Sequence, residues 1–324
     1  MVSPGSTFTI PVDVKGDANG PLSSEYLTAL GISDTSLSPS SVSLLWEDTD
    51  GLISNVSDIY NGKVNITLSS SSGNAVIAAY DTNGTTILWS WHIWVSDYNP
   101  DDGGMTYAYN NGTYTTTFMD RNLGATAVAT AINSPLSSYG FYYQWGRKDP
   151  FPSAKATTLT RGTTSDSGSA TMYGPKTSVT ITSGAVSIVT ATGNPTTFYV
   201  SSSDPNDWNS SPNNNLWGNP TTSIVNAKSP YDPCPVGWRV PVYKSGVSPW
   251  SGLSDSWSTW SSKVGYPPGS GYRHYSNGEF CGVGLLGSCW AAPRGFCLYF
   301  SSLSFHSSYE LVPVYGYSVR CCRE

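Results

Sequence analysis

The first 95 residues consist of short segments of strand length separated by turn signals. Residues 7–14 alternate between apolar and polar side chains, and residues 75–80 form a continuous apolar run. Asn61-Gly62 supplies the positive backbone φ angles that a tight hairpin needs. An aromatic segment, residues 86–95, closes this region. Strands at roughly ten-residue spacing, without a helical period, predict a β-sandwich.

A polar segment rich in turn-forming residues, 97–104, separates this region from the rest of the chain. Since 324 residues exceed one average domain, we expect two, over residues 1–97 and 98–324. Residues 157–230 are dominated by Thr, Ser, Asn and Pro, which is typical of an insertion across a scaffold. The second domain is therefore expected to carry a long insertion at about 157–230.

The second half contains one clear strand signal and two weaker helix signals. Residues 114–120 predict a strand, and residues 139–148 predict a helix that ends before Pro150. A further helix is expected at about 242–261, although its glycines and proline are unfavourable in a helix. The whole chain is thus expected to be mainly β with minor α.

Composition excludes several classes of partner. The net charge is −6 and the pI is about 5.0, so no basic nucleic-acid footprint is present and nothing marks an anionic membrane as a target. No apolar run approaches the ~20 residues that span a bilayer, and residues 1–5 lack the features of a signal peptide. Six cysteines without a CxxC pair, and only three histidines, make a zinc site unexpected. We expect no nucleic acid, no membrane insertion and no cofactor.

Residues 272–315 are crowded with Tyr, Ser, Cys, Phe, Gly and Arg, and they contain no Lys, Gln or Met. Tyr and Phe offer a large contact area, Ser and Gly offer adaptability, and Arg is a charged anchor, as in known binding surfaces. We therefore expect exposed side chains clustered on one face, with Trp290, Leu298 and Phe300 turned inward. The candidate ligand-binding residues are His274, Tyr275, Leu285, Leu286, Arg294, Phe296, His306, Tyr309, Glu310 and Tyr315.

Six blocks of sequence connect the second half to a known family. Residues 100–324 resemble the Fibrobacter succinogenes major paralogous domain, which has a C-type-lectin-like α+β fold. The resemblance implies a disulfide between Cys234 and Cys321, with Cys322 on the opposite face of the last strand. The blocks are residues 118–125, 143–151, 194–198, 207–208 together with 216–218, 232–241 and 318–321.

The upstream segments 73–80 and 87–95 look like the fimbrillin-type proteins of gut Bacteroidetes, which build type V pili. Together the two resemblances imply a secreted pilus-tip adhesin at the cell surface. Its ligand would be a host or bacterial surface protein or glycan. An adjacent pilin subunit would add a donor strand to the β-sandwich.

The candidate surface departs from the resembled family, and a second hypothesis about its function therefore remains. Diversity-generating retroelements mutate adenines, and Asn codons changed in this way yield Tyr, Ser, Cys, Phe, His, Leu, Gly and Arg but never Lys, Gln, Met, Trp or Glu. The absence of Lys, Gln and Met from residues 272–315 fits that pattern, and a bacteriophage receptor-binding protein is therefore the alternative. A less specific hypothesis is that residues 272–315 form an aromatic binding loop that is not diversified.

Calcium-dependent sugar binding and catalysis are not expected. Between residues 270 and 320 the acidic residues are only Glu279 and Glu310, too few for the six to eight oxygen ligands of calcium. Asp120 with His92 or His274 would be the best catalytic candidates, but no motif connects them. We expect Asp120 and its two neighbours to satisfy buried backbone groups instead, and no enzyme activity.

Overall fold

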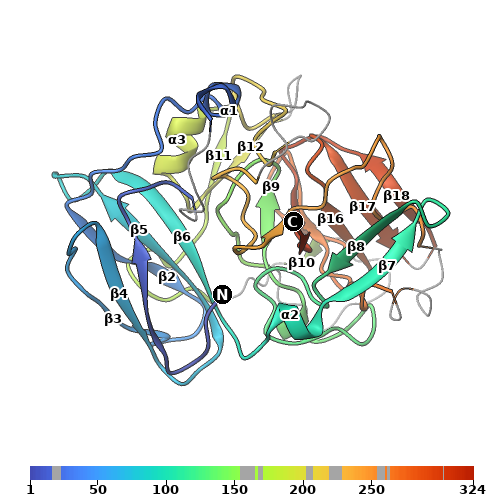
Figure 1. Ribbon diagram of the computed structural model, residues 1–324, viewed down its shortest axis with the longest axis horizontal. Coiled ribbons are helices and arrows are strands. Elements are labelled where there is room, and N and C mark those ends of the chain that lie inside the picture. Colours follow the sequence, from blue (N-terminus) through green and yellow to red (C-terminus); the bar gives the residue numbers. More distant parts are fainter. Residues whose placement is uncertain are drawn as a thin grey trace.

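The computed structural model describes residues 1–16, 23–153, 165–166, 171–201, 207–218, 228–253, 260, 263–301 and 303–324. The protein is mainly β, as expected, with several sheets and three short helices in these residues (Figure 1). No helix in the described ranges is long and apolar enough to cross a membrane. The helices are α1 (Ser24–Leu30), α2 (Pro100–Gly103) and α3 (Ile188–Gly193), with a 3₁₀ turn at Leu136–Ser138.

Two three-stranded antiparallel sheets form the amino-terminal part. One has the order β1 (Thr7–Pro11), β4 (Lys63–Leu68), β3 (Ile53–Val56), and the other β2 (Ser41–Glu47), β5 (Gly73–Tyr80), β6 (Ile87–Val95). Their facing sides enclose one apolar cluster, which includes Val64 and Ile77. The tight turn expected at Asn61-Gly62 is confirmed, because both residues have positive φ.

The second part is built on a larger sheet with the strand order β10-β15-β14-β19-β16-β17-β18, and β9 pairs with β19. A four-stranded sheet, β13-β20-β8-β7, and a parallel pair, β11-β12, complete it. The bounds are β7 (Met105–Tyr109), β8 (Tyr114–Phe118), β9 (Tyr142–Gln144), β10 (Ser165–Asp166), β11 (Thr180–Ser183), β12 (Thr197–Val200), β13 (Trp238–Arg239), β14 (Tyr272–Arg273), β15 (Phe280–Cys281), β16 (Leu286–Trp290), β17 (Phe296–Ser301), β18 (Phe305–Glu310), β19 (Gly316–Ser318) and β20 (Cys322–Arg323).

The two parts share a core. Side chains alternate along β5, so Ile77 faces the sheet β1-β4-β3 while Val76 and Ala78 face the second part. There they belong to one buried cluster with Phe141 and Trp145. Burial on both faces explains the unbroken apolar run of this strand. Separate cores were expected, whereas β5 contributes to both clusters; the boundary near residue 97 stays a prediction.

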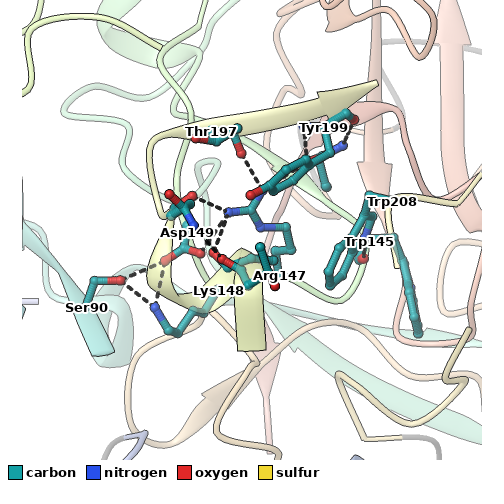
Figure 2. A network of polar contacts seen from close by, with 12 residues as sticks. Ser90, Trp145, Arg147, Lys148, Asp149, Thr197, Tyr199 and Trp208 are labelled. Atoms are coloured by element: carbon teal, nitrogen blue, oxygen red, sulfur yellow. Dashed lines mark hydrogen bonds and ion pairs between the residues drawn. The ribbon is translucent and has the colours of Figure 1, made fainter. Parts of the chain in front are cut away.

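A buried polar network joins the same two parts (Figure 2). Asp149 accepts a hydrogen bond from Ser90 of β6 and lies 2.7 Å from the Lys148 ammonium and 3.2 Å from the Arg147 guanidinium. Arg147 also donates to the carbonyl of Thr197 on β12. Burial lowers the pKa of Lys148, while Asp149 opposes that shift. Because the three charged groups are almost fully buried, both cations depend on the Asp149 carboxylate for compensation.

The helix predicted over residues 139–148 is wrong. Gly140 and Gly146 adopt positive φ, which interrupts any helix there, and a Cβ at position 140 would lie 2.4 Å from the Leu123 carbonyl oxygen. The residues between them form β9, which pairs with β19. Buried aromatic residues here fit a central strand better than a helix.

The helix expected at about 242–261 is absent from the described residues 242–253, where a turn with positive φ at Gly246 replaces it. Residues 254–259 and 261–262 of that stretch lie outside the described residues. Much of the expected insertion, including residues 157–164 and 219–227, lies outside them too.

The disulfide between Cys234 and Cys321 is confirmed, with the two residues 87 positions apart. Cys321 belongs to the core cluster shared by both parts, and Cys322 belongs to a second cluster around Phe118 and Trp250. The two neighbouring cysteines therefore face opposite sides of the chain, as expected. The bridge ties the segment before β13 to the segment before β20.

Candidate ligand-binding site

One face of the largest sheet gathers aromatic side chains from four places in the sequence. On β17, Leu298 and Phe300 point into the cluster around Trp260, so Tyr299 between them points to the opposite face. β14, β18 and the loop before β19 place their own rings beside it. We call this group the aromatic face: Tyr272, His274, Tyr275, Tyr299, His306, Tyr309 and Tyr315.

Tyr315 is the centre of the first half of the aromatic face. Its ring centroid lies 5.1 Å from Tyr275, 5.5 Å from Tyr272 and 5.7 Å from His274, in edge-to-face arrangements. It also stacks on buried Tyr317 at 5.3 Å. Aromatic pairs in such geometries add roughly 0.5–1.5 kcal/mol each beyond simple burial. The half-buried rings therefore hold one another in place.

The second half surrounds Tyr309 on the edge strand β18. Its ring centroid lies 5.0 Å from His306 and 5.3 Å from Tyr299. Tyr309 also acts electrostatically on Tyr315, so the two halves adjoin. His306 and Tyr309 are exposed, and Tyr309 keeps 39% of its surface accessible.

The hydroxyl groups of Tyr315 and Tyr299 stay protonated at neutral pH. Partial burial, with Tyr275 the next cause, raises the pKa of Tyr315 to about 12, and burial also raises the pKa of Tyr299. Burial lowers the pKa of His274, which Glu279 at the margin opposes. Tyr315 and Tyr299 therefore offer neutral hydroxyls that both donate and accept hydrogen bonds, beside apolar ring surface.

The base of the aromatic face is closely packed. Trp290, Leu298 and Phe300 are at most 2% exposed, so their expected inward orientation is confirmed. The Trp290 indole nitrogen donates to the carbonyl of Tyr143 at 2.8 Å, and its ring contacts Tyr317. This packing fixes the strands from which the exposed rings project.

Five of the ten candidate residues lie outside the aromatic face. Phe296 is on the same side of β17 as Leu298 and packs on Tyr243, because side chains two apart share a face. Glu310 pairs with Phe296 across the strands and is directed to that side as well. The expectation that all candidate side chains cluster on one face is therefore wrong for Phe296 and Glu310.

The other three occupy positions at the ends of β16. The guanidinium of Arg294, in the turn between β16 and β17, forms an ion pair of 2.7 Å with Asp207. Leu285 and Leu286 are half-buried at the start of β16. Tyr272 and Tyr299, which belong to the aromatic face, were not among the candidates. Side chains alternate along a strand, so the inward positions expected for Leu298 and Phe300 implied that Tyr299 between them points outward. This was the signal that could have identified Tyr299.

The residues considered for catalysis have separate partners. Asp120 pairs with Arg121 at 2.7 Å, and its backbone nitrogen donates to the Tyr98 hydroxyl. His92 is bonded to Asn74 and Tyr143, and burial lowers its pKa to about 3. His274 belongs to the aromatic face. Within the described residues no group of three or more metal-ligating side chains gathers.

Comparison of this sequence and fold with known proteins gives no match: no family model, no curated protein and no solved structure is similar enough to report. Any conclusion about the function of this chain therefore has to come from the arrangement of its own residues. The aromatic face is the arrangement in this chain that most directly indicates a binding role.

Proposed function

We propose that this chain is a cell-surface adhesin, a pilus-tip subunit that binds a protein or glycan ligand through the aromatic face. The observation that carries this proposal is the gathering of seven partly exposed Tyr and His rings on one side of the largest sheet. Tyr rings provide contact area with only two side-chain torsions to order, so their binding loses little entropy. The proposal includes a C-type-lectin-like fold for the second part.

The rings also suit either kind of ligand. Tyr side chains are enriched among the residues that dominate protein–protein binding energy. Their hydroxyls and apolar faces together match the mixed polar and apolar surface of a sugar. The same surface would serve the alternative, a bacteriophage receptor-binding protein, so a separate feature has to distinguish the two.

The feature that favours a pilus subunit over a virion protein is an open groove of about 320 Å³ beside strands β1 and β6. Val2 donates to the Trp94 carbonyl and accepts from the Ser96 amide, so Trp94 of β6 and Ser96 just after the strand direct backbone groups to the outer edge. Ser90 and His92 share that orientation. In the described part of the chain they have no backbone partner on this edge. Such an edge is suited to the addition of a strand.

We propose that an adjacent pilin subunit adds its donor strand to this edge of β6. Apolar side chains of β1, Phe8 and Ile10, line the groove and would receive the side chains of the added strand. This assembly function favours the pilus over the virion, because a tip subunit must be joined to the subunit below it.

Replacing Ile10 by Glu is expected to prevent incorporation into pili, because a buried carboxylate would oppose the donor strand. Thr9→Glu is the matched control, since Thr9 is exposed on the other side of β1. Sheared pili from cells expressing each variant are measured by immunoblotting. Equal incorporation of both variants, with both folded, would argue against donor-strand addition in this groove.

Replacing Tyr309 or Tyr299 by Ala is expected to weaken ligand binding by about 1–3 kcal/mol. The free energy of unfolding should change little for Tyr309→Ala, because that ring is exposed, and should fall more for Tyr299→Ala, whose half-buried ring packs on the core. Binding is measured against arrays of host proteins, bacterial surface proteins and glycans. Tyr60→Ala is the control, because Tyr60 is 79% exposed in the first part of the chain.

Phe296→Ala separates packing from binding at the same strand. Because Phe296 packs on Tyr243 on the opposite side, its loss is expected to lower stability while binding is kept. The proposal fails if Phe296→Ala abolishes binding and the two tyrosine variants bind like the wild type.

A further inference from the structure

A buried arginine in β14 has no acidic partner in the described part of the chain. Arg273 is 5% exposed, and within those residues its guanidinium donates to the carbonyls of Gly278 and Pro152, at 3.1 and 3.2 Å. Its Nε atom is buried, and no hydrogen-bond partner for it is found among the described residues. No acidic side chain among the described residues forms an ion pair with it.

Two other buried arginines make more polar contacts than Arg273, although the Nε atom of Arg147 also lacks a hydrogen-bond partner among the described residues. Arg147 is paired with Asp149, and all three side-chain nitrogens of Arg320 donate hydrogen bonds. Arg273 instead lies 4.2 Å from the ring centre of Phe280. Burial lowers its pKa to about 10, so the group still carries its charge at neutral pH. A buried charge with an unused donor is unfavourable unless another group completes it.

The space beside Arg273 has room for such a group. A pocket of about 200 Å³ opens there between the β11 region and β15. Its walls are about equally polar and apolar, and two hydroxyl side chains add hydrogen-bonding capacity. The lining residues are Pro152, Met172, Thr177, Ser178, Val179, Ile181, Arg273 and Phe280.

We propose that this pocket binds a small organic carboxylate, with the carboxylate on the Arg273 guanidinium and its apolar or sugar portion against Ile181 and Phe280. The planar guanidinium matches a carboxylate in shape and charge, and each of its two terminal nitrogens keeps a second N–H beside the one that it donates to a carbonyl. The carboxylate is supplied either by a peptide carboxyl terminus or by an acidic sugar. Because side chains alternate, Arg273 faces away from neighbouring Tyr272, so the pocket is separate from the aromatic face and does not depend on the proposed adhesion.

The probes are N-acetylalanine and glucuronate, with N-acetylalaninamide and glucose as uncharged counterparts, titrated into the full chain. A ligand that binds the folded state raises Tm in a saturable manner. We expect a rise with at least one carboxylate and none with the uncharged counterparts. A response to N-acetylalanine alone identifies a peptide terminus, and a response to glucuronate alone identifies an acidic sugar. A response only to added sulfate, or to none of these compounds, overturns the proposal.

Two variants locate the binding. Ile181→Trp fills the pocket from a side chain that is 41% exposed and should weaken carboxylate binding at least tenfold in a folded protein. Thr182→Trp, on the next and exposed residue of β11, should bind normally. Arg273→Met should abolish carboxylate binding. If that variant does not fold, the affinity of Ile181→Trp for the carboxylate tests the proposed location. Unchanged carboxylate affinity in Ile181→Trp overturns the proposed location.

Discussion

Replacing Cys234 and Cys321 together by alanine is expected to lower the free energy of unfolding by about 4–5 kcal/mol, on the loop-entropy model for a loop of this length. The bridge closes a loop over a sequence separation of 87 residues, and reducing it gives the unfolded chain many more conformations. Both cysteines are buried, so the bridge also joins the central core to the carboxyl-terminal segment. Urea unfolding of the variant and the wild type measures the difference.

Cys281→Ala is the matched control, because Cys281 is free and half-buried. It should change the free energy of unfolding little. A double variant that unfolds at the urea concentration of the wild type, with an unchanged slope, would show that the bridge does not constrain the unfolded chain. A non-reduced digest analysed by mass spectrometry verifies that the bridge is present in the starting protein.

Replacing Asp149 by Asn should destabilise the protein by about 3–5 kcal/mol, because it leaves buried cations without a counter-charge. Lys148 and Arg147 both contact this carboxylate, and they are 8% and 2% exposed. The network also links β6 to the second part, so we expect the whole fold to lose stability. Thermal and denaturant unfolding at neutral pH measure the effect.

Asp101→Asn is the control for a charge pair in water. Asp101 lies 2.6 Å from Arg323, but both side chains are largely exposed, and such pairs contribute about 0–1 kcal/mol. Equal effects of the two substitutions would contradict the role given to the buried network. A large effect confined to Asp149→Asn would support it.

Local patterns predicted the strands of the amino-terminal part well. The apolar run at residues 75–80 lies within β5, and the aromatic segment at 86–95 matches β6 within one residue. Alternation also predicted the opposite orientations of Cys321 and Cys322. Such features depend on neighbouring residues, which a sequence displays directly.

The segment at 139–148 shows where local reasoning failed. Its aromatic residues fit a helix or a buried strand, and periodicity alone cannot separate the two in so short a run. Pairing with β19, more than 170 residues further on, determined the strand. The glycines at 140 and 146 were the local sign that was overlooked.

By itself, the sequence determined the mainly β character, the amino-terminal strands and, through a family resemblance, the disulfide. Only the tertiary structure decided that β5 serves two cores, that Phe296 and Tyr299 face opposite sides, and that Arg273 is buried without an acid. The physical reason is the range of the interactions involved. Strand formation and alternation follow from adjacent residues, whereas burial, charge compensation and the grouping of rings depend on segments distant in the chain.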